Sequence, residues 1–338
     1  MITIYDIAKK TGYTAPTISK AINGNGGLSQ KTRARILKVV EDLEYKPNMA
    51  ARALTTRKTH LIGVIFEDSN MGRGFEHPLF GGLLNAFRYL VEDAGYDILF
   101  LSKHFQQKNN SYVEHSQYRD VDGILLLNPD ASSLELSKLA ECGIPCVSTN
   151  DFIPGISTIV SANKEAGFQA TEYLISMGHR NIGFLGAPFT STSRASVERR
   201  QGYEEALKKA NLNVNSSYIE VCTGWQIEAG FEGAKRLCER NKDLTAVFCA
   251  NDTIAFGLIL YCNQNNIPLP DKLSIVGFDD DRVASYITPS LTTFRQNKQI
   301  LAKMTADVLL QSIAGNQITE TIRVPAEMII RDSVKKII

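Results

Sequence analysis

The 338-residue sequence has no long hydrophobic run. None of its apolar stretches approaches the ~20 residues that a helix needs to cross a bilayer, so we expect no membrane partner. Charged and polar residues interrupt the opening MITIYDIAKKTGYT, which excludes a secretory signal peptide in this stretch. The sequence therefore predicts a cytoplasmic protein.

Cysteine is sparse, and no CxxC motif is present. The six cysteines mostly lie among apolar residues, so we interpret them as small buried hydrophobic side chains in a reducing compartment. They are Cys142, Cys146, Cys222, Cys238, Cys249 and Cys262.

The motifs of common enzymes are also missing. The sequence contains no GxSxG, HExxH or P-loop motif, and no glycine-rich dinucleotide motif follows its first predicted strand. Asp279 and Asp280 are adjacent carboxylates that could in principle serve glycoside hydrolysis. We interpret His179, in a Gly-His turn, as structural. We therefore predict no catalytic residue, no metal, no cofactor and no enzymatic activity. The histidines considered as metal ligands lack the required spacing: His77, His104, His115 and His179.

Charge is distributed unevenly along the chain. Residues 1–60 contain 11 Lys and Arg but only 4 Asp and Glu, whereas the remainder contains 26 and 32. A basic segment before an acidic body indicates that only the first part meets a polyanion such as a nucleic acid. At ~100–200 residues per domain, the length predicts two or three domains.

Three short helices are predicted in the basic segment. Thr3 can cap the first, with an acidic residue three positions later as in a capping box, and Gly12 ends it. Thr14 begins a second helix with Pro16 in its first turn, and Ser29 begins a third. Two short helices joined by a glycine-containing turn form the helix-turn-helix pattern, whose second helix can enter a major groove. The alternative is a plain three-helix packing unit, which would not explain the positive charge.

The segments TIYDIAKKTGYTAPTISKAING and TRARILKVVEDLEYKPNMAARAL resemble the headpiece and hinge of the LacI/GalR family of transcription regulators. The resemblance implies a DNA-binding headpiece over 1–45 and a hinge helix or linker over 46–60. It also implies a homodimer on palindromic double-stranded operator DNA, because one headpiece reads one half-site. The implied DNA-binding residues are Thr3, Tyr5, Thr14, Ala15, Pro16, Thr17, Ser19, Lys20, Asn23, Asn48, Ala51 and Leu54.

The second helix departs from family members that carry Tyr and Gln at the first two base-reading positions. Ala15 and Pro16 have no side-chain donors, so they offer only apolar contact, for instance to a thymine methyl group. Lys20 then carries most of the hydrogen-bonding readout. By resemblance, the base-reading residues are Ala15, Pro16 and Lys20. The residues near phosphates are Thr14, Thr17 and Asn23.

The hinge, by the same resemblance, becomes helical when two copies pair on DNA. Leu54 would enter the minor groove as an apolar wedge, and small alanines such as Ala51 would permit close approach. Folding coupled to binding would make DNA affinity sensitive to the distance between the two attached bodies. The alternative for this segment is a passive linker.

From Leu61 onward, short apolar runs alternate with helical stretches such as Phe80–Ala94 and Ala166–Met177. This alternation predicts an α/β fold with mostly parallel sheets in two similar lobes. Phrases such as GHRNIGFLGAP and VPAEMIIRDS resemble the family's effector domain, a bilobal type I periplasmic-binding-protein-like domain with two parallel sheets. We expect an N-lobe over 61–161 and 296–323, and a C-lobe over 162–295 and 324–338. The predicted strands are Leu61–Phe66, Tyr96–Leu101, Gly123–Leu127, Pro145–Thr149, Asn181–Leu185, Ala246–Ala250 and Ser274–Phe278, with a β-like stretch at Tyr218–Cys222.

Ligands of such sheets bind beyond the carboxyl ends of the strands. The residues after these strands include carboxylates, amides, arginines and the only tryptophan, which suit a polyol because planar polar groups bind vicinal hydroxyls and an indole stacks on a sugar. This favours a small sugar or sugar phosphate over a purine as effector. By resemblance, the effector-binding residues are Phe80, Asn150, Arg199, Trp225, Asn251 and Asp279.

Together these features predict a repressor of carbohydrate-utilisation genes. Closure of the lobes on the effector would change operator affinity allosterically. Two other classes are weighed against this interpretation. A solute-binding receptor would need an export signal, and a sugar-metabolising enzyme would leave the basic helix-turn-helix unexplained.

Overall fold

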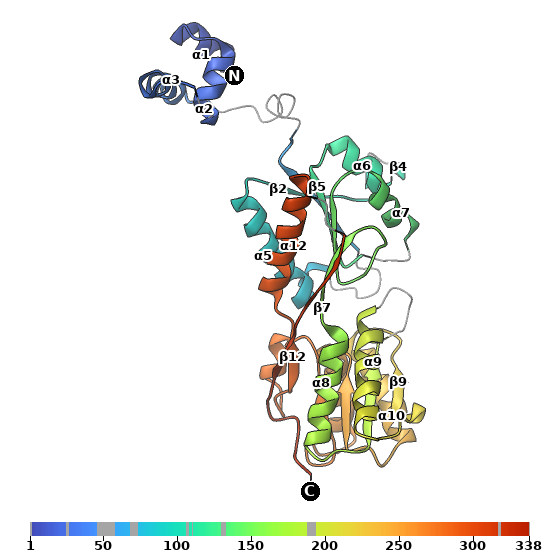
Figure 1. Ribbon diagram of the computed structural model, residues 1–338. Helices are drawn as coiled ribbons and strands as arrows, with labels where there is room; N and C mark the ends of the chain where they lie inside the picture. Colours follow the sequence, from blue (N-terminus) through green and yellow to red (C-terminus); the bar gives the residue numbers. More distant parts are fainter. Residues whose placement is uncertain are drawn as a thin grey trace. The chain divides into compact units, whose positions relative to one another are not determined.

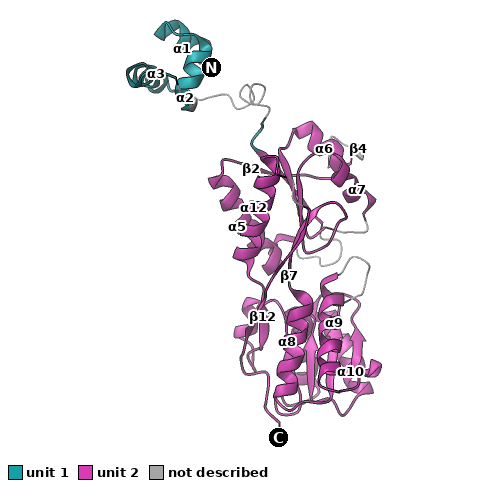
Figure 2. Ribbon diagram, viewed as in Figure 1, with its two compact units in different colours: residues 1–60 teal, residues 61–338 magenta. Residues whose placement is uncertain are grey.

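The chain divides into two compact units in a computed structural model: residues 1–60 and residues 61–338 (Figure 2). Among the described residues, no helix has both the length and the apolar character needed to cross a membrane. The structure describes residues 2–24, 27–45, 58–67, 74–105, 108–109, 111–129, 133–187, 194–316 and 319–337.

The described part of the first unit contains three helices whose ends match the predicted caps. The backbone N–H of Thr3 donates to the Asp6 carboxylate at 2.8 Å, and the Ser29 hydroxyl accepts from the backbone of Thr32 at 3.2 Å. Gly12 ends the first helix in the left-handed conformation, with φ +75°, which glycine adopts without steric cost. The helices are α1 (Ile4–Thr11), α2 (Ala15–Asn23) and α3 (Gln30–Asp42) (Figure 1).

A very small core holds these helices together. Ile7 of α1, Ile18 and Ala21 of α2, and Ile36 of α3 are all fully buried. Each helix contributes at least one of these side chains, so all three helices pack on one shared core.

The second unit contains two parallel sheets, and the first of them forms the N-lobe. Its described strands are in the order β13-β7-β6-β5-β1-β2. Because every pairing is parallel, the carboxyl ends of all six strands lie at one edge. The strands are β1 (Leu61–Phe66), β2 (Asp97–Phe100), β5 (Gly123–Leu127), β6 (Cys146–Thr149), β7 (Ser157–Ser161) and β13 (Thr321–Val324).

Helices cover both faces of this sheet. On one face, α5 and α12 pack side by side over a cluster that includes Phe87, Leu125 and Leu309 (Figure 1). On the other face, Tyr112 and Leu136 pack against Leu126. The remaining N-lobe elements are η1 (Gly74–Glu76), α5 (Pro78–Asp93), β3 (His104–Phe105), β4 (Lys108–Asn109), α6 (Tyr112–Arg119), α7 (Leu134–Ser137), η2 (Lys138–Glu141) and α12 (Lys298–Ile313).

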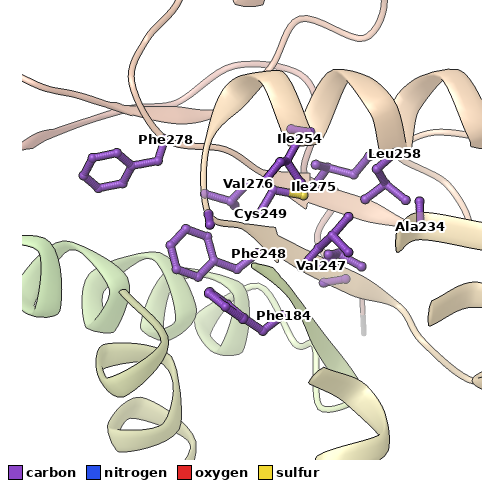
Figure 3. Packing of buried hydrophobic residues seen from close by; sticks show 14 of the residues in the cluster. Phe184, Ala234, Val247, Phe248, Cys249, Ile254, Leu258, Ile275, Val276 and Phe278 are labelled. Carbon is purple, nitrogen blue, oxygen red and sulfur yellow. The ribbon is translucent and has the colours of Figure 1, made fainter. Parts of the chain in front are cut away.

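The C-lobe is built on a four-stranded parallel sheet, in the order β11-β10-β8-β9. Its core is one continuous cluster in which Phe184 and Phe248 meet edge to face, 5.5 Å between ring centroids (Figure 3). The elements are α8 (Asn163–Ser176), β8 (Ile182–Gly186), α9 (Arg194–Lys209), η3 (Ser216–Tyr218), β9 (Ile219–Val221), α10 (Ile227–Arg240), β10 (Ala246–Cys249), α11 (Asp252–Gln264), β11 (Ser274–Val276), η4 (Arg282–Ser285), β12 (Thr293–Arg295) and β14 (Glu327–Ile329).

The chain passes between the two lobes three times. It leaves the N-lobe sheet after β7, returns to it through α12 after β12, and leaves again after β13. The last passage brings β14 antiparallel to β12, in a separate two-stranded sheet. Three connecting segments therefore join the lobes.

The structure contains all seven predicted strands and a strand within the predicted β-like stretch, with small differences at their ends. The predicted strand Ser274–Phe278 is shorter, since β11 ends at Val276. The helix predicted from Phe80 begins at Pro78, because His77 caps it by accepting from the backbone of Leu79 at 3.3 Å. Strands β3, β4, β7, β12, β13 and β14 were not predicted; five of these six have only two to four residues.

Candidate functional site

Helix α2 presents a polar and exposed face opposite the headpiece core. Pro16 and Lys20 are exposed and one turn apart, so they lie on the same side of the helix. The Thr14 and Thr17 hydroxyls lie 2.9 Å apart at its start. Tyr5 of α1 is 73% exposed.

The other predicted DNA-binding residues divide into three groups. Thr3 is exposed, and Ala15 and Ser19 are partly exposed. The helical position of Asn23 is described but its side chain is not. Asn48, Ala51 and Leu54 lie outside the described residues, together with most of the predicted hinge.

Side chains from both lobes meet in one cavity of the second unit. All six predicted effector-binding residues line it, although they come from six separate segments of the chain. The lining also includes three residues that are not among the predicted effector-binding residues: His77, Leu79 and Gln296. The full lining is His77, Leu79, Phe80, Asn150, Arg199, Trp225, Asn251, Asp279 and Gln296.

Arg199 is the only arginine or lysine among these lining residues. Its guanidinium is 3% exposed; Nη1 donates to the Ala250 carbonyl at 2.6 Å and Nε to Asn163 Oδ1 at 2.9 Å. It also lies 3.5 Å from the centroid of the Phe278 ring, a cation–π contact. Burial lowers the pKa of Arg199 to about 10, opposed by Asp279 and other carboxylates. The group therefore remains a fixed positive charge at neutral pH.

A close contact between two helices sets the position of Arg199. A Cβ on Gly202 of α9 would lie 2.0 Å from the Lys164 carbonyl of α8, and one on Gly167 would lie 2.3 Å from the Arg199 carbonyl. Only glycine at both positions lets the two backbones pack this tightly. The contact brings Arg199 next to Asn163 at the start of α8.

Two acidic side chains lie near this cation. Burial raises the pKa of Asp279, opposed by Arg199, and its backbone has φ +123°, a strained conformation for a non-glycine residue. Asp252 is fully buried, and burial together with Asp279 raises its pKa to about 8. Asp252 accepts from Thr293 Oγ1 at 2.5 Å and from the Asp281 backbone at 2.7 Å. Arg199 therefore lies in the field of two buried carboxyl groups, of which Asp252 holds its proton below about pH 8.

Two amide side chains are oriented by bonds behind the cavity. Asn251 caps α11, because its Oδ1 accepts from the Ile254 backbone at 2.8 Å. Asn150, with φ +77°, donates from Nδ2 to Asn128 Oδ1 at 3.0 Å. Asn128 in turn donates to the Glu67 carbonyl at 3.1 Å. Asn128 is thus a positioning residue that sequence reasoning missed, because only the pairing of β5 with β6 brings it beside Asn150.

Aromatic rings form the apolar part of the lining. Phe80 is 3% exposed and its ring lies 4.7 Å from that of His77. Trp225 is partly exposed, precedes α10 and packs against the C-lobe core. The cavity therefore joins N-lobe and C-lobe rings to a set of polar groups, a combination typical of small-molecule sites.

Two contacts join the lobes beside the cavity. Gln296 donates to Asp279 at 2.6 Å and accepts from Ser161 of β7 at 2.5 Å. Arg323 of β13 makes a bidentate ion pair with Glu198 of α9, at 2.8 and 2.9 Å. Burial alone would raise the pKa of Glu198, but hydrogen bonds from Arg323 and a neighbouring arginine outweigh it and lower the pKa. These contacts hold the lobes together.

The enclosed space is small. Among the described residues it amounts to about 30 Å³, whereas ligand pockets typically have ~300–1,000 Å³. A ligand of the size of a sugar would therefore need the lobes to separate or the lining side chains to move.

Several other candidates have structural partners away from the cavity. Asp280 is paired with Arg295 and Arg331, at 2.7 and 2.6 Å, so both of its carboxylate oxygens are held in ion pairs. His179 bonds Thr245 and a backbone carbonyl, which agrees with a structural role. No group of three or more His, Cys, Asp or Glu in the described part of the chain could hold a metal ion.

Comparison with known proteins gives matches over both units. The model of bacterial regulatory proteins of the lacI family matches residues 3–48, and that of a periplasmic binding protein-like domain matches residues 171–334. The HTH-type transcriptional repressor PurR of Vibrio campbellii is 31% identical over 350 residues, covering 100% of both chains. The probable HTH-type transcriptional repressor ExuR of Bacillus subtilis is 30% identical over 341 residues, covering 100% of this chain and 99% of the relative.

Solved structures with the same architecture cover nearly the whole chain. A complex of the transcriptional regulator CelR with cellobiose has a TM-score of 0.71 at 25% identity, covering 98% of this chain and 100% of that one. A lac repressor dimer bound to operator and the anti-inducer ONPF has a TM-score of 0.81 at 20% identity, covering 99% of each chain. The latter shows the shared fold: an N-terminal helix-turn-helix and a type I periplasmic-binding-protein-like domain.

Proposed function

The chain belongs to the lacI family of bacterial regulatory proteins, and on that premise we propose that it represses carbohydrate-utilisation genes under the control of a small sugar or sugar phosphate. It binds a palindromic operator as a homodimer in the cytoplasm, and it is a regulator rather than an enzyme. The observation that carries the proposal is the cavity in which six residues from both lobes converge.

The headpiece, residues 1–45, supplies operator recognition. Its basic charge and the exposed face of α2 support this role. Lys20 donates to base edges, Pro16 and Ala15 make apolar contacts, and Thr14 and Thr17 contact phosphates. Residues 46–60 act as the hinge that couples this unit to the effector-binding one.

The cavity binds the effector through three kinds of contact. The Arg199 guanidinium and the Asp279 carboxylate bind adjacent hydroxyls in a bidentate manner. The Asn150 and Asn251 amides fix their orientation, and Trp225 with Phe80 stacks on the C–H faces. The cellobiose bound to CelR, a regulator 25% identical over nearly the whole chain, supports a sugar as effector.

Effector binding changes the spacing of the lobes. Entry of a sugar breaks or stretches the Gln296 contacts, because they occupy the space between Ser161 and Asp279. The lobes follow the division 61–161 with 296–323 and 162–295 with 324–338. In a dimer, the new spacing alters the hinge and thereby the operator affinity.

Selection from random-sequence duplex DNA tests this proposal. The full chain is mixed with the pool, with and without a panel of sugars, sugar phosphates and purine bases, and the bound fraction is sequenced. We expect a palindrome of about 14–20 base pairs, enriched or depleted by a sugar. Lys20→Ala should relax specificity at one position of each half-site, whereas the exposed Lys38→Ala should leave the recovered sequence unchanged.

Different results would contradict different parts of the proposal. Binding that is sensitive to salt but independent of sequence would remove the headpiece assignment and favour a solute receptor. A recovered palindrome that responds only to a purine would retain the regulator and reject the sugar. Turnover of a sugar in the panel would identify an enzyme.

A further inference from the structure

Two of the six cysteines have surroundings unlike those of the other four. Cys142 follows η2 and Cys146 begins β6, and both are partly exposed. Their sulfur atoms lie 3.1 and 3.9 Å from the same acceptor, the carbonyl oxygen of Leu139. The Cys146 thiol also hydrogen-bonds to the Cys142 sulfur. The two sulfurs are therefore direct neighbours, which corrects the interpretation of all six cysteines as inert core side chains.

A tight turn holds this pair together. Only three residues separate the two cysteines, and the first of them, Gly143, has φ +79°. The backbone N–H of Ile144 donates to the Cys142 sulfur. The Cys146 sulfur also lies 3.2 Å from the Ile144 carbonyl oxygen. Backbone groups of one short turn therefore contact both sulfurs.

The two thiols differ in acidity. The hydrogen bond from Cys146 lowers the pKa of Cys142 to about 6, against the opposing effect of burial. The pKa of Cys146 is raised by that same bond and by burial. At neutral pH the pair therefore holds one thiolate nucleophile beside one thiol, the arrangement found at reactive cysteines.

The remaining four cysteines provide an internal contrast. All are 8% exposed or less. Burial raises the pKa of Cys238 to about 11 and those of Cys222 and Cys262 to about 12. Thiols of this kind are unreactive near neutral pH.

We propose that Cys142 and Cys146 form a peroxide-reactive dithiol, a modification site in which a hydroperoxide oxidises Cys142 and Cys146 then closes a disulfide. In the first step, the Cys142 sulfur attacks one peroxide oxygen, the O–O bond breaks, and hydroxide leaves. In the second, the Cys146 sulfur attacks the resulting sulfenic acid, the S–O bond breaks, and water leaves. Two thiols lose two electrons in total, and one peroxide becomes two molecules of water.

Metal binding would use these sulfurs in a different way. A structural zinc site needs four ligands, and a group of even three is absent from the described residues. The pair also lies at the amino ends of the N-lobe strands, whereas Asn150 and the effector cavity lie beyond their carboxyl ends. Oxidation of the dithiol is therefore independent of the proposed effector site.

Peptide mapping of the full chain after peroxide treatment tests the dithiol. Reduced protein receives a small excess of hydrogen peroxide, N-ethylmaleimide blocks the remaining thiols, and trypsin releases one peptide, residues 139–164, that carries both cysteines. We expect this peptide to become two hydrogens lighter and unblocked, while the other four cysteines stay reduced. At pH 7, about 90% of Cys142 is thiolate, against about 1% for a thiol with the ordinary pKa of 9.0.

Single variants separate the two roles. Cys146→Ser should stop the reaction at a sulfenic acid on Cys142, which dimedone captures, and Cys142→Ser should abolish the disulfide. Cys238→Ala is the matched control and should change neither product. The rate with wild-type protein should rise between pH 5 and 7 and then level off. Three results with the wild-type protein would overturn the proposal: oxidation spread over all six cysteines, a rate that rises only above pH 8, or a Cys142 product without disulfide. These results do not depend on the variants, so the test remains valid even if a variant misfolds.

Discussion

The two units of the chain differ in how many apolar and charged side chains they bury. Four fully buried apolar side chains hold the described headpiece together, whereas the second unit contains three clusters that extend over both sheets. The described headpiece has one buried polar residue, Thr11, but the second unit buries Arg199, Asp252 and Glu198. The headpiece keeps its functional groups on the surface and depends on a minimal core. The second unit has enough apolar burial to carry charged groups inside, where they can bind a ligand.

The largest effect is expected from removing the buried cation. Arg199→Met leaves Asp279 and Asp252 without their positive neighbour, and breaking a buried charge group costs about 3–5 kcal/mol. Thermal unfolding should show this loss in the second unit only, and the response of operator binding to effector should disappear. Arg200→Met is the matched control, because Arg200 pairs with Glu204 at the surface. Equal losses in the two variants would mean that burial of Arg199 is not what matters.

A smaller substitution should cost the headpiece nearly as much unfolding free energy. Ile18→Ala removes one of its four core side chains, at a cost of about 2–5 kcal/mol. A core of this size has too little stability to remain folded after that loss, so operator binding should fail. The melting temperature of residues 61–338 should stay unchanged. The control is Leu37→Ala, at a site 38% exposed on α3. Retention of operator affinity in Ile18→Ala would contradict the comparison between the units.

The third prediction concerns the dependence of the unfolding free energy on pH. The pKa of Asp252 is raised to about 8 in the folded chain, from 3.8 when unperturbed. Between these values the folded state holds a proton that the unfolded state has released, so the stabilisation is complete below pH 4 and is lost progressively up to pH 8. The unfolding free energy should fall by up to about 1.4 kcal/mol per pH unit in this range.

Asp252→Asn should flatten this dependence, because an amide does not ionise. Its oxygen can still accept from the Asp281 backbone, and its NH2 group can donate to Thr293. Denaturant unfolding from pH 5 to 8 measures the slope. A variant as pH-dependent as the wild type would show that another group titrates.

The smallest effect compares equivalent caps in the two units. Ser29 caps α3, and Asn297 caps α12 by accepting from Ile300 at 3.0 Å. Replacing either by alanine costs about 1 kcal/mol. Ser29→Ala should weaken operator binding at 37 °C, while Asn297→Ala should leave it unchanged, as fluorescence anisotropy with labelled operator would measure. Equal effects would mean that the two units unfold together.

Local signals made the headpiece and the strands predictable. Thr3, Gly12 and Ser29 end or begin helices through bonds to residues at most four positions away, and β1 and β5 are apolar runs with clear boundaries. The six effector candidates follow from a rule about strand ends together with a family resemblance. They line one cavity, although their role in binding stays a prediction.

Contacts between distant segments were not predictable in this way. Gln296 enters the cavity only because the chain passes between the lobes there, and its partner Ser161 is 135 residues away. The Arg323–Glu198 pair joins residues 125 positions apart. Neither has a local pattern. The neighbouring thiols of Cys142 and Cys146 were not predicted for a different reason. Three residues separate these cysteines, whereas the motif that predicts a dithiol, CxxC, has two.

The repeated passage of the chain between the lobes also has a consequence for its synthesis on the ribosome. The C-lobe sheet is encoded without interruption between residues 182 and 276, but the N-lobe acquires α12 and β13 only after that sheet is complete. Until then Phe87, Leu125 and their neighbours have no α12 to cover them. We therefore expect the C-lobe sheet to form while the N-lobe is unfinished, although N-terminal parts of nascent chains generally fold first. Chaperones that recognise emerging apolar surfaces would then act mainly on the first N-lobe segment, residues 61–161.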